Sequence, residues 1–236
     1  MMVSDFHSHI LPGIDDGSRS VEESMELLRM EAEQGIRHVV ATPHFYPRHD
    51  TPERFLKRRA EAEAILRREM EKHDGLPKLS VGAEVYFFHG ISDSDLISKL
   101  TIDQKRCILI EMPSPPWTES MYRELENLHV KQGLIPIVAH VDRYIGLFRT
   151  YGIPNRLAEL PVLVQANADF FLKPTTACMA LRMLKKEQIH LLGSDCHGSS
   201  SRKPNMGPAL ERIKKRLGDA AIDGICASQR YVLPDE

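Results

Sequence analysis

Residues 5–17 read Asp-Phe-His-Ser-His-Ile-Leu-Pro-Gly-Ile-Asp-Asp-Gly, and both the expected fold and the expected site follow from them. The segment before His7 is short and contains Val and Phe, which is typical of an extended strand. Because alternate residues of a strand point to the same side, about 6–7 Å apart, His7 and His9 can bind one metal ion. A single His-x-His pair is weak support, since two ordinary histidines are the commoner explanation.

The chain has 236 residues, of which 42% are hydrophobic, and this is enough for one large core. We therefore expect a single domain over residues 1–236. The formal net charge is -2, and Lys and Arg are mixed with Asp and Glu, which argues against nucleic-acid binding. No stretch approaches the roughly 20 apolar residues of a membrane span, so we expect a cytoplasmic protein without membrane insertion. The four cysteines lack metal-site or disulfide spacing, and reduced thiols are expected.

Strand-like and helix-like segments alternate along the chain without a repeat or a linker. Ser20-Val21-Glu22-Glu23 is a capping box that starts one helix, and Thr51 followed by Pro52 starts another. After the first strand, further strands are expected near residues 39–42, 79–83, 107–110, 135–139, 162–166 and 189–194. This alternation favours parallel β/α architecture, and we expect one α/β barrel.

Nearly all of these strands end in a residue that can bind a metal. The residues at or just after the strand ends are His7 with His9, His44, Glu84, Glu111, His140, Asn167, and Asp195 with His197. In a β/α barrel the carboxyl ends of the strands meet at one mouth, so residues that are distant in sequence become neighbours. Each residue alone could be an ordinary polar strand end. Together they would leave carboxylates and imidazoles crowded and unpaired unless cations lie between them.

Several short motifs follow one another in a distinctive order. They are His7-Ser8-His9, Asp16-Gly17, Thr42-Pro43-His44, Gly82-Ala83-Glu84, Glu111, Ala139-His140-Val141-Asp142-Arg143-Tyr144 and Ser194-Asp195-Cys196-His197. This order resembles the PHP (polymerase and histidinol phosphatase) superfamily over nearly the entire chain. Residues 7–17 and 139–144 look most like the bacterial capsule-type protein-tyrosine phosphatases. The resemblance implies a distorted (β/α)7 TIM-like barrel and a trinuclear site that usually holds manganese.

The resemblance also implies how three divalent ions would be held. One ion would be bound by His7, His9, Glu84 and Asp195, a second by Glu84, Glu111 and His140, and a third by Asp16, His44 and His197. All nine positions carry the expected residue type. The mixture of His, Asp and Glu suits Mn²⁺ but also accepts iron, zinc, cobalt or magnesium, so the sequence does not choose the metal.

Such a site is suited to phosphate ester hydrolysis. A carboxylate such as Glu84, bridging two cations about 3.5–4 Å apart, favours a shared water that becomes hydroxide and attacks phosphorus in line. Arg143 and Arg202 resemble the phosphate-clamping arginines of the family, and a planar guanidinium suits bidentate phosphate binding. Tyr46 and His49 closely follow an expected ligand, so they are candidates to line the mouth and contact substrate.

A competing mechanism is suggested by Cys196 and Arg202, whose Cys-x5-Arg spacing is that of cysteine-dependent tyrosine phosphatases. Asp195, directly before the thiol, would raise the thiol pKa rather than lower it. Alternation along the strand end would also turn Cys196 away from the side that Asp195 shares with His197. The metal mechanism is therefore favoured.

The resemblance implies a protein-tyrosine phosphatase that acts on the tyrosine-rich tail of a bacterial tyrosine autokinase, in the control of capsule or exopolysaccharide. The main alternative keeps the same site but assigns histidinol phosphate or another small phosphomonoester as substrate. A nuclease of the PHP type is a third hypothesis, weakened by the absence of a basic surface in the sequence. A metal-binding module without catalysis is a fourth. A homo-oligomer formed through the outer helices is compatible with the sequence.

Overall fold

The computed structural model describes residues 3–146 and 151–233. The strands are β1 (Ser4–Ser8), β2 (His38–Ala41), β3 (His44–Phe45), β4 (Lys78–Val81), β5 (Glu84–Tyr86), β6 (Cys107–Glu111), β7 (Ile135–Val138), β8 (Leu163–Asn167) and β9 (Leu191–Gly193). The helices are α1 (Val21–Glu33), α2 (Pro52–Met70), α3 (Glu119–Gln132), α4 (Ile153–Leu157), α5 (Ala168–Leu172), α6 (Ala177–Lys185), α7 (Met206–Leu217) and α8 (Asp219–Val232). Short 3₁₀ turns lie at Ile91–Asp93, Ile97–Leu100, Ile102–Gln104 and Val141–Arg143.

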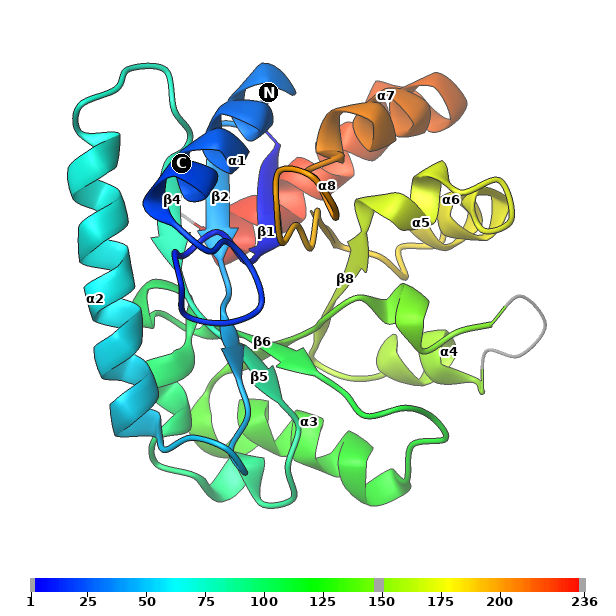
Figure 1. Cartoon of the computed structure of the whole chain (residues 1–236). Coiled ribbons are helices and arrows are strands. Elements are labelled where there is room, and N and C mark those ends of the chain that lie inside the picture. The colour runs from blue at the N-terminus through cyan, green and yellow to red at the C-terminus, as the bar shows by residue number, and fades with distance from the viewer. Residues whose placement is uncertain (1–2, 147–150, 234–236) are drawn as a thin grey trace.

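The strands pair in parallel and form two sheets, in the orders β1-β2-β4 and β3-β5-β6-β7-β8-β9. β3 continues the path of β2, and β5 continues that of β4, so two chain segments run through both sheets (Figure 1). The last strand turns back to the first, because Ser8 bridges to Cys196 and the Asp195 amide donates to the His7 carbonyl at 2.7 Å. The result is a distorted α/β barrel of the predicted type.

The second and third predicted strands are each interrupted just before their ligand residue. Pro43 lies at the first break, where its missing amide hydrogen prevents a regular ladder. Gly82 lies at the second break, where an added Cβ would be 3.0 Å from the Ile102 side chain. Arg59 of α2 braces this break by donating to the carbonyls of Gly82 at 2.8 Å and Lys99 at 3.2 Å. Each break redirects the final part of the strand, β3 or β5, into the second sheet.

Two helix starts that the capping residues predict are confirmed. The Ser20 hydroxyl accepts from the Glu23 amide at 3.3 Å, and the Thr51 hydroxyl accepts from the Arg54 amide at 3.3 Å. The side chain of each cap thus satisfies an amide that has no partner within the helix. Within the described ranges, no helix is both long enough and apolar enough to cross a bilayer.

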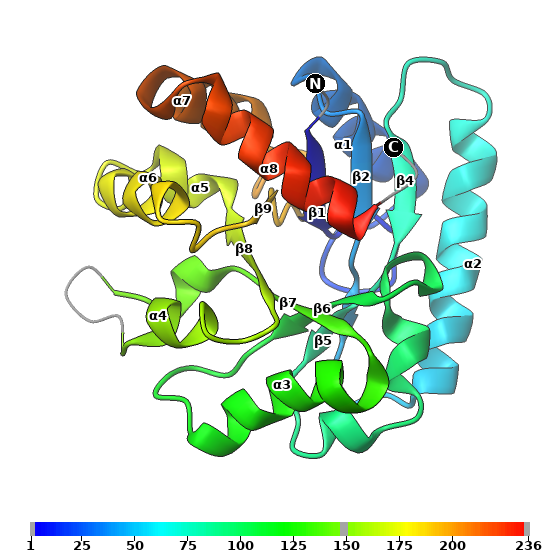
Figure 2. The same ribbon diagram turned by 180° about the vertical axis from the view of Figure 1, so that it is seen from behind.

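Apolar side chains fill the inside of the barrel and the space under the helices. In β6, Leu109 belongs to the inner cluster, whereas Ile108 and Ile110 pack in the outer cluster against the helices. Figure 2 shows α8 passing in front of β1 in the view from behind. There the side chain of Gln229 accepts from the Ser4 amide at 3.3 Å and donates to its carbonyl at 3.2 Å. α8 therefore covers the amino end of β1, and the carboxyl ends of the strands form the mouth on the opposite side.

Replacing Arg59 with methionine is expected to lower the free energy of unfolding by about 2–3 kcal/mol, because two carbonyl groups lose their donor. Arg59 is only 8% exposed, so water cannot easily replace the guanidinium. Urea unfolding followed by circular dichroism measures the change. The matched control is Arg68→Met on the exposed side of the same helix, with an expected change below about 0.5 kcal/mol. Equal effects of the two substitutions would contradict a stabilising role for the hydrogen bonds from Arg59 to Gly82 and Lys99.

Candidate metal centre

The nine expected metal ligands gather at the mouth of the barrel. They are His7 and His9 at the end of β1, Asp16 in the loop that follows, His44 in β3, Glu84 in β5, Glu111 at the end of β6, His140 after β7, and Asp195 and His197 after β9. Six of them are buried, His44 and Glu111 are partly buried, and Asp16 is exposed. The fold therefore brings together residues that the sequence spreads over almost its whole length.

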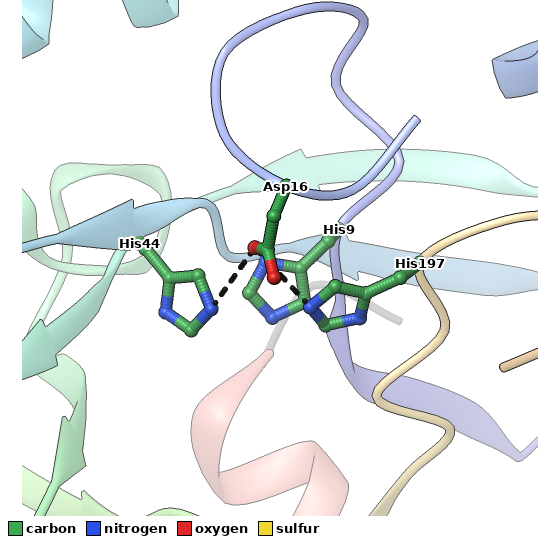
Figure 3. Close-up of side chains that lie close together, drawn as sticks. All are labelled: His9, Asp16, His44 and His197. Atoms are coloured by element: carbon green, nitrogen blue, oxygen red, sulfur yellow. Dashed lines mark ion pairs between the residues drawn. The ribbon is translucent and has the colours of Figure 1, made fainter. Parts of the chain in front are cut away.

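One group combines His9, Asp16, His44 and His197, whose ligand atoms lie within 4.8 Å of one another (Figure 3). Asp16 approaches from its loop, with Oδ1 at 3.4 Å from His44 Nε2 and 3.5 Å from His197 Nε2. Gly17 allows this approach, since an added Cβ would lie 2.2 Å from the carbonyl oxygen of His9. The group therefore depends on a backbone contact that only glycine permits.

Two further groups lie beside the first and share members with it. They are His7, His9 and Asp195, and His44, Glu84 and Glu111. Glu84 is central, because its Oε1 is 2.7 Å from His140 Nε2. Its Oε2 is 2.8 Å from His44 Nδ1 and 3.2 Å from His7 Nε2. These groups differ from the implied three-ion arrangement in three ways. His9 and His44 each belong to two groups, Glu84 is grouped with His44 and Glu111 rather than with His7 and His9, and His140 belongs to none of the three.

Asp15 was not expected at the site, but it orients His9. Its Oδ2 accepts from His9 Nδ1 at 2.8 Å and from the His44 amide at 3.0 Å. An ionised carboxylate only accepts, so His9 Nδ1 carries the hydrogen and Nε2 faces the metal-binding groups. Burial alone would lower the pKa of His9, but Asp15 and Glu84 outweigh it and raise this pKa to about 10. The sequence carries one signal of this role, the Asp15-Asp16 pair in the loop after His9.

Two amide side chains at the end of β8 hold further ligands. Gln165 Oε1 accepts from the His140 amide at 2.6 Å and from His7 Nδ1 at 3.2 Å. Since this oxygen is an acceptor, His7 carries its hydrogen on Nδ1 and turns Nε2 towards the neighbouring ligands. Asn167 Nδ2 donates to Asp195 Oδ2 at 3.0 Å. His140 and Asp195 both have left-handed backbone, at φ 31° and 53°. The His140 amide donates to Gln165 and the Asp195 amide to the His7 carbonyl, and these two hydrogen bonds help to hold the strained backbone.

Asp5 fixes the backbone beneath the mouth. Its Oδ1 accepts from the amides of His7 at 3.0 Å and Ser194 at 2.9 Å, and its Oδ2 accepts from the Ser194 hydroxyl at 2.5 Å. The Glu31 carboxyl of α1 is buried beside it. Burial raises the pKa of Glu31 well above its ordinary value, and the charge of Asp5 adds to this effect. Burial also raises the pKa of Asp5, although its hydrogen bonds with Ser194 and His7 oppose that shift.

The position of Cys196 excludes it as a nucleophile. Its side chain is fully buried, and its thiol lies within 4.8 Å of the carboxyl groups of Asp5 and Glu31. Burial raises the pKa of the thiol well above its ordinary value, and the two carboxyl groups add to the shift. A reactive cysteine needs an accessible thiolate, and Cys196 provides neither access nor charge.

The donor atoms at the mouth fit divalent cations. The Nε2 atoms of His7 and His9 lie 3.1 Å apart, so two lone pairs face each other unless a proton or a cation lies between them. Glu111 Oε2 and His197 Nε2 are buried and make no hydrogen bond to any described residue. Imidazole nitrogen and carboxylate oxygen are ligands that manganese, iron and zinc all accept. Hydrogen bonds among the described side chains thus leave lone-pair atoms without a partner, and metal ions would bind to these atoms.

Two arginines reach the mouth from different loops, and both were expected there. Arg143 lies in the 3₁₀ turn after β7, donates to Asp195 Oδ2 at 2.5 Å and is 3.7 Å from Glu111 Oε1. Arg202 donates to Asp195 Oδ1 at 2.8 Å. Their side chains are 41% and 44% exposed. Each guanidinium can therefore meet an anion from solvent while remaining anchored above the ligands.

A cavity of about 550 Å³ opens beside Asp16 and His44, and Tyr46 and His49 both line it. The Tyr46 ring stacks on that of His44 with a centroid distance of 5.1 Å. Both residues expected to line the mouth therefore lie in the wall next to the metal-binding groups. A larger cavity of about 930 Å³ is lined by residues of α4, α6 and α8 and by none of the expected site residues.

Residues 3–232 match the family described as capsular polysaccharide synthesis, CpsB/CapC. The tyrosine-protein phosphatase CpsB of Streptococcus pneumoniae is 29% identical over 234 residues, which cover 91% of this chain and 90% of that protein. The tyrosine-protein phosphatase YwqE of Bacillus subtilis is 29% identical over 227 residues, which cover 91% of this chain and 85% of that protein.

Solved structures share the fold. A chain from the crystal structures of YwqE from Bacillus subtilis and CpsB from Streptococcus pneumoniae, described as unique metal-dependent tyrosine phosphatases, gives a TM-score of 0.84 at 23% identity and covers 99% of this chain and 95% of that chain. Histidinol phosphate phosphatase from Lactococcus lactis, complexed with zinc, L-histidinol and phosphate, gives 0.58 at 15% identity and covers 93% of each chain. Because the family match extends over nearly the whole sequence, the chain belongs to the CpsB/CapC family of capsular polysaccharide synthesis.

Proposed function

We propose that the protein is a metal-dependent phosphomonoester hydrolase that removes phosphate from tyrosine residues of proteins. The observation that carries the proposal is the convergence of three overlapping metal-binding groups and two arginines at one mouth. The names of CpsB and YwqE, both tyrosine-protein phosphatases and both 29% identical to this chain, support the same activity. We further propose that residues 1–236 act as a single catalytic domain.

The proposed metal sites use the nine residues at the mouth. One ion would be held by His7, His9, Glu84 and Asp195, a second by Glu84, Glu111 and His140, and a third by Asp16, His44 and His197. Three divalent ions, with manganese as the first choice, are supported by the number of converging donors and by the buried atoms that lack hydrogen bonds. When bound, such cations lower the pKa of a coordinated water and neutralise charge on phosphoryl oxygens.

Arg143 and Arg202 bind and orient the phosphoryl group. Asp195 anchors both Arg143 and Arg202, and this leaves further N–H groups on each guanidinium for phosphate oxygens. A planar guanidinium can donate two parallel hydrogen bonds to one phosphate. Because charge on the phosphoryl oxygens changes during transfer, donors fixed in advance stabilise the transition state more than they stabilise the bound ester.

Tyr46 provides an aromatic wall beside the proposed phosphate position. Burial raises the pKa of its hydroxyl, and the charges of Glu111 and Glu84 add to the shift, so Tyr46 remains protonated. The ring of a phosphotyrosine can pack against such a wall. The leaving group is then a tyrosinate, whose parent pKa of about 10 lets it depart without a strong general acid. No residue of the site is assigned that acid role.

We propose that the physiological substrate is the tyrosine-rich tail of a bacterial tyrosine autokinase rather than histidinol phosphate. The match to the CpsB/CapC family supports this choice, whereas the histidinol phosphate phosphatase shares the fold at 15% identity. A cytoplasmic location agrees with buried thiols such as Cys107 and Cys196, which a reducing compartment preserves. A homo-oligomer formed through the outer helices stays a prediction from the sequence.

Removal of metal with EDTA is expected to lower kcat for a phosphotyrosyl peptide at least about 100-fold, because bound cations generate the nucleophile and stabilise charge. Added Mn²⁺ should restore the rate of phosphate release, measured colorimetrically. Iodoacetamide is expected to leave that rate unchanged, because Cys196 is fully buried. Loss of activity on alkylation together with resistance to EDTA would refute the metal mechanism.

The substitution Arg143→Ala is expected to lower kcat/KM about 100-fold, because charge-assisted hydrogen bonds to phosphate are lost. Arg143→Lys should give an intermediate value, since it keeps the charge but loses the planar fork. Metal content, measured by elemental analysis, should not change. The matched control is Arg156→Ala on α4, whose guanidinium pairs with Glu119 and Glu159 outside the site. A comparable loss in the control, or loss of metal in the Arg143 variants, would argue against phosphate binding.

Metal binding to the metal-free protein at pH 8 is expected to release at least one proton. The pKa of His9 is raised to about 10, so its ring is protonated at that pH and must lose the Nε2 proton before it can bind a cation. Calorimetric titration with Mn²⁺ in Tris and in HEPES detects the release, since the two buffers differ in ionisation enthalpy. Identical apparent enthalpies in both buffers would show that His9 is neutral before binding.

A further inference from the structure

A second cavity, of about 640 Å³, adjoins the metal centre. Tyr46 and His49 line it and also line the cavity beside Asp16 and His44, so the two cavities share a wall. We call the second one the aromatic cavity. Its other lining residues are Pro47, Arg48, Tyr86, Phe87, Phe88, His89, Pro113 and Met121.

The pairing of β3 with β5 places residues of the aromatic cavity next to the metal-binding groups. In the pairing of β3 with β5, His44 lies opposite Glu84, and Tyr46 and Tyr86 each follow two residues later on the same side. The ring centroids of Tyr46 and Tyr86 are 5.7 Å apart. Tyr86 is in register with Glu111 on β6. The aromatic cavity therefore begins two residues beyond the proposed ligands His44 and Glu84.

The lining of the aromatic cavity is suited to an aromatic ring. Phe87 and Met121, at 6% and 7% exposure, form its buried part, and Tyr86, Phe88 and Pro113 are half-buried around it. Aromatic rings favour offset or edge-to-face contacts with one another, and a methionine sulfur makes favourable contacts with a ring edge. The volume is within the range of about 300–1,000 Å³ that small-ligand sites occupy.

The polar residues of the aromatic cavity carry no negative charge. They include Arg48, His49 and His89, and no Asp or Glu is among the lining residues. The adjoining cavity differs, because Asp15 and Asp16 are part of its lining. A peptide segment close to a phosphate is itself negatively charged, so it meets a favourable or neutral potential here.

We propose that the aromatic cavity binds an aromatic side chain of the same polypeptide whose phosphotyrosine enters the metal centre. The inference rests on the proposed phosphatase function and adds a specificity subsite to it. An extended peptide advances about 3.3–3.6 Å per residue, so a neighbouring side chain reaches the cavity within a few residues. A small phosphomonoester has no second side chain to place there. The subsite therefore favours protein substrates with a second aromatic residue near the phosphotyrosine.

The test compares phosphotyrosyl peptides of equal length and charge that carry either Phe or Ala at one position. That position is moved from three residues before the phosphotyrosine to three residues after it. Phenyl phosphate serves as the substrate without flanking residues. For the metal-loaded wild-type protein, kcat/KM is expected to be about tenfold higher for the Phe peptide than for the Ala peptide at the best position.

Phe88→Ala is expected to reduce this ratio to about 1 while kcat/KM for phenyl phosphate stays unchanged. Phe88→Leu keeps an apolar side chain against the core but removes the ring, so it should lose most of the preference even if the alanine variant folds poorly. The matched control is Tyr231→Ala, which removes an aromatic ring that is 60% exposed on α8. This control is expected to keep the full ratio.

Equal kcat/KM for the Phe and Ala peptides at every position would overturn the subsite, as would an unchanged preference in both Phe88 variants. If neither phenyl phosphate nor any peptide is hydrolysed, the proposed function fails instead. Binding of fluorescently labelled versions of the same peptides, measured by fluorescence anisotropy, then still tests the subsite. Tighter binding of the Phe peptide, lost in Phe88→Leu, would support it, and equal affinities would overturn it.

Discussion

The crowding of imidazoles and carboxylates at the barrel mouth is the constraint on which the rest of the structure depends. Groups of this kind, held within 4.8 Å of one another and mostly buried, are tolerated only when cations or hydrogen bonds compensate them. Several of these ligands have a neighbouring side chain that forms a compensating hydrogen bond with them. Asp15 orients His9, Gln165 orients His7, and Asn167 holds Asp195. These contacts fix which ring nitrogen faces the centre before any ion binds.

The sequence predicts the barrel and the composition of its mouth because one simple rule connects them. Short apolar segments end in ligand-type residues, as the strand ending at Glu111 shows, and the carboxyl ends of parallel strands meet at one mouth. Arg143 and Arg202 are predicted from motifs rather than from strand pattern, and both reach the same carboxylate. Local chemistry at the helix starts is equally simple, as Ser20 and Thr51 show.

Other features depend on partners that no local pattern reveals. Gln165 and His7 are 158 positions apart in the chain, and a glutamine within a strand has no distinctive spacing to mark it as a support. The breaks at Pro43 and Gly82 look like strand ends in the sequence, whereas in space they pass two strands from one sheet to the other. The aromatic cavity is assembled from three segments, 46–49, 86–89 and 113–121, whose proximity is set by the barrel as a whole.

The side chain of Gln165 links two proposed ion sites, because its single oxygen receives both the His7 ring and the His140 backbone. A single amide oxygen therefore positions two ligands from different strands, the ring of His7 on β1 and the backbone of His140 after β7. A substitution of Gln165 would disturb both proposed ion sites at once, although residue 165 is itself not a ligand.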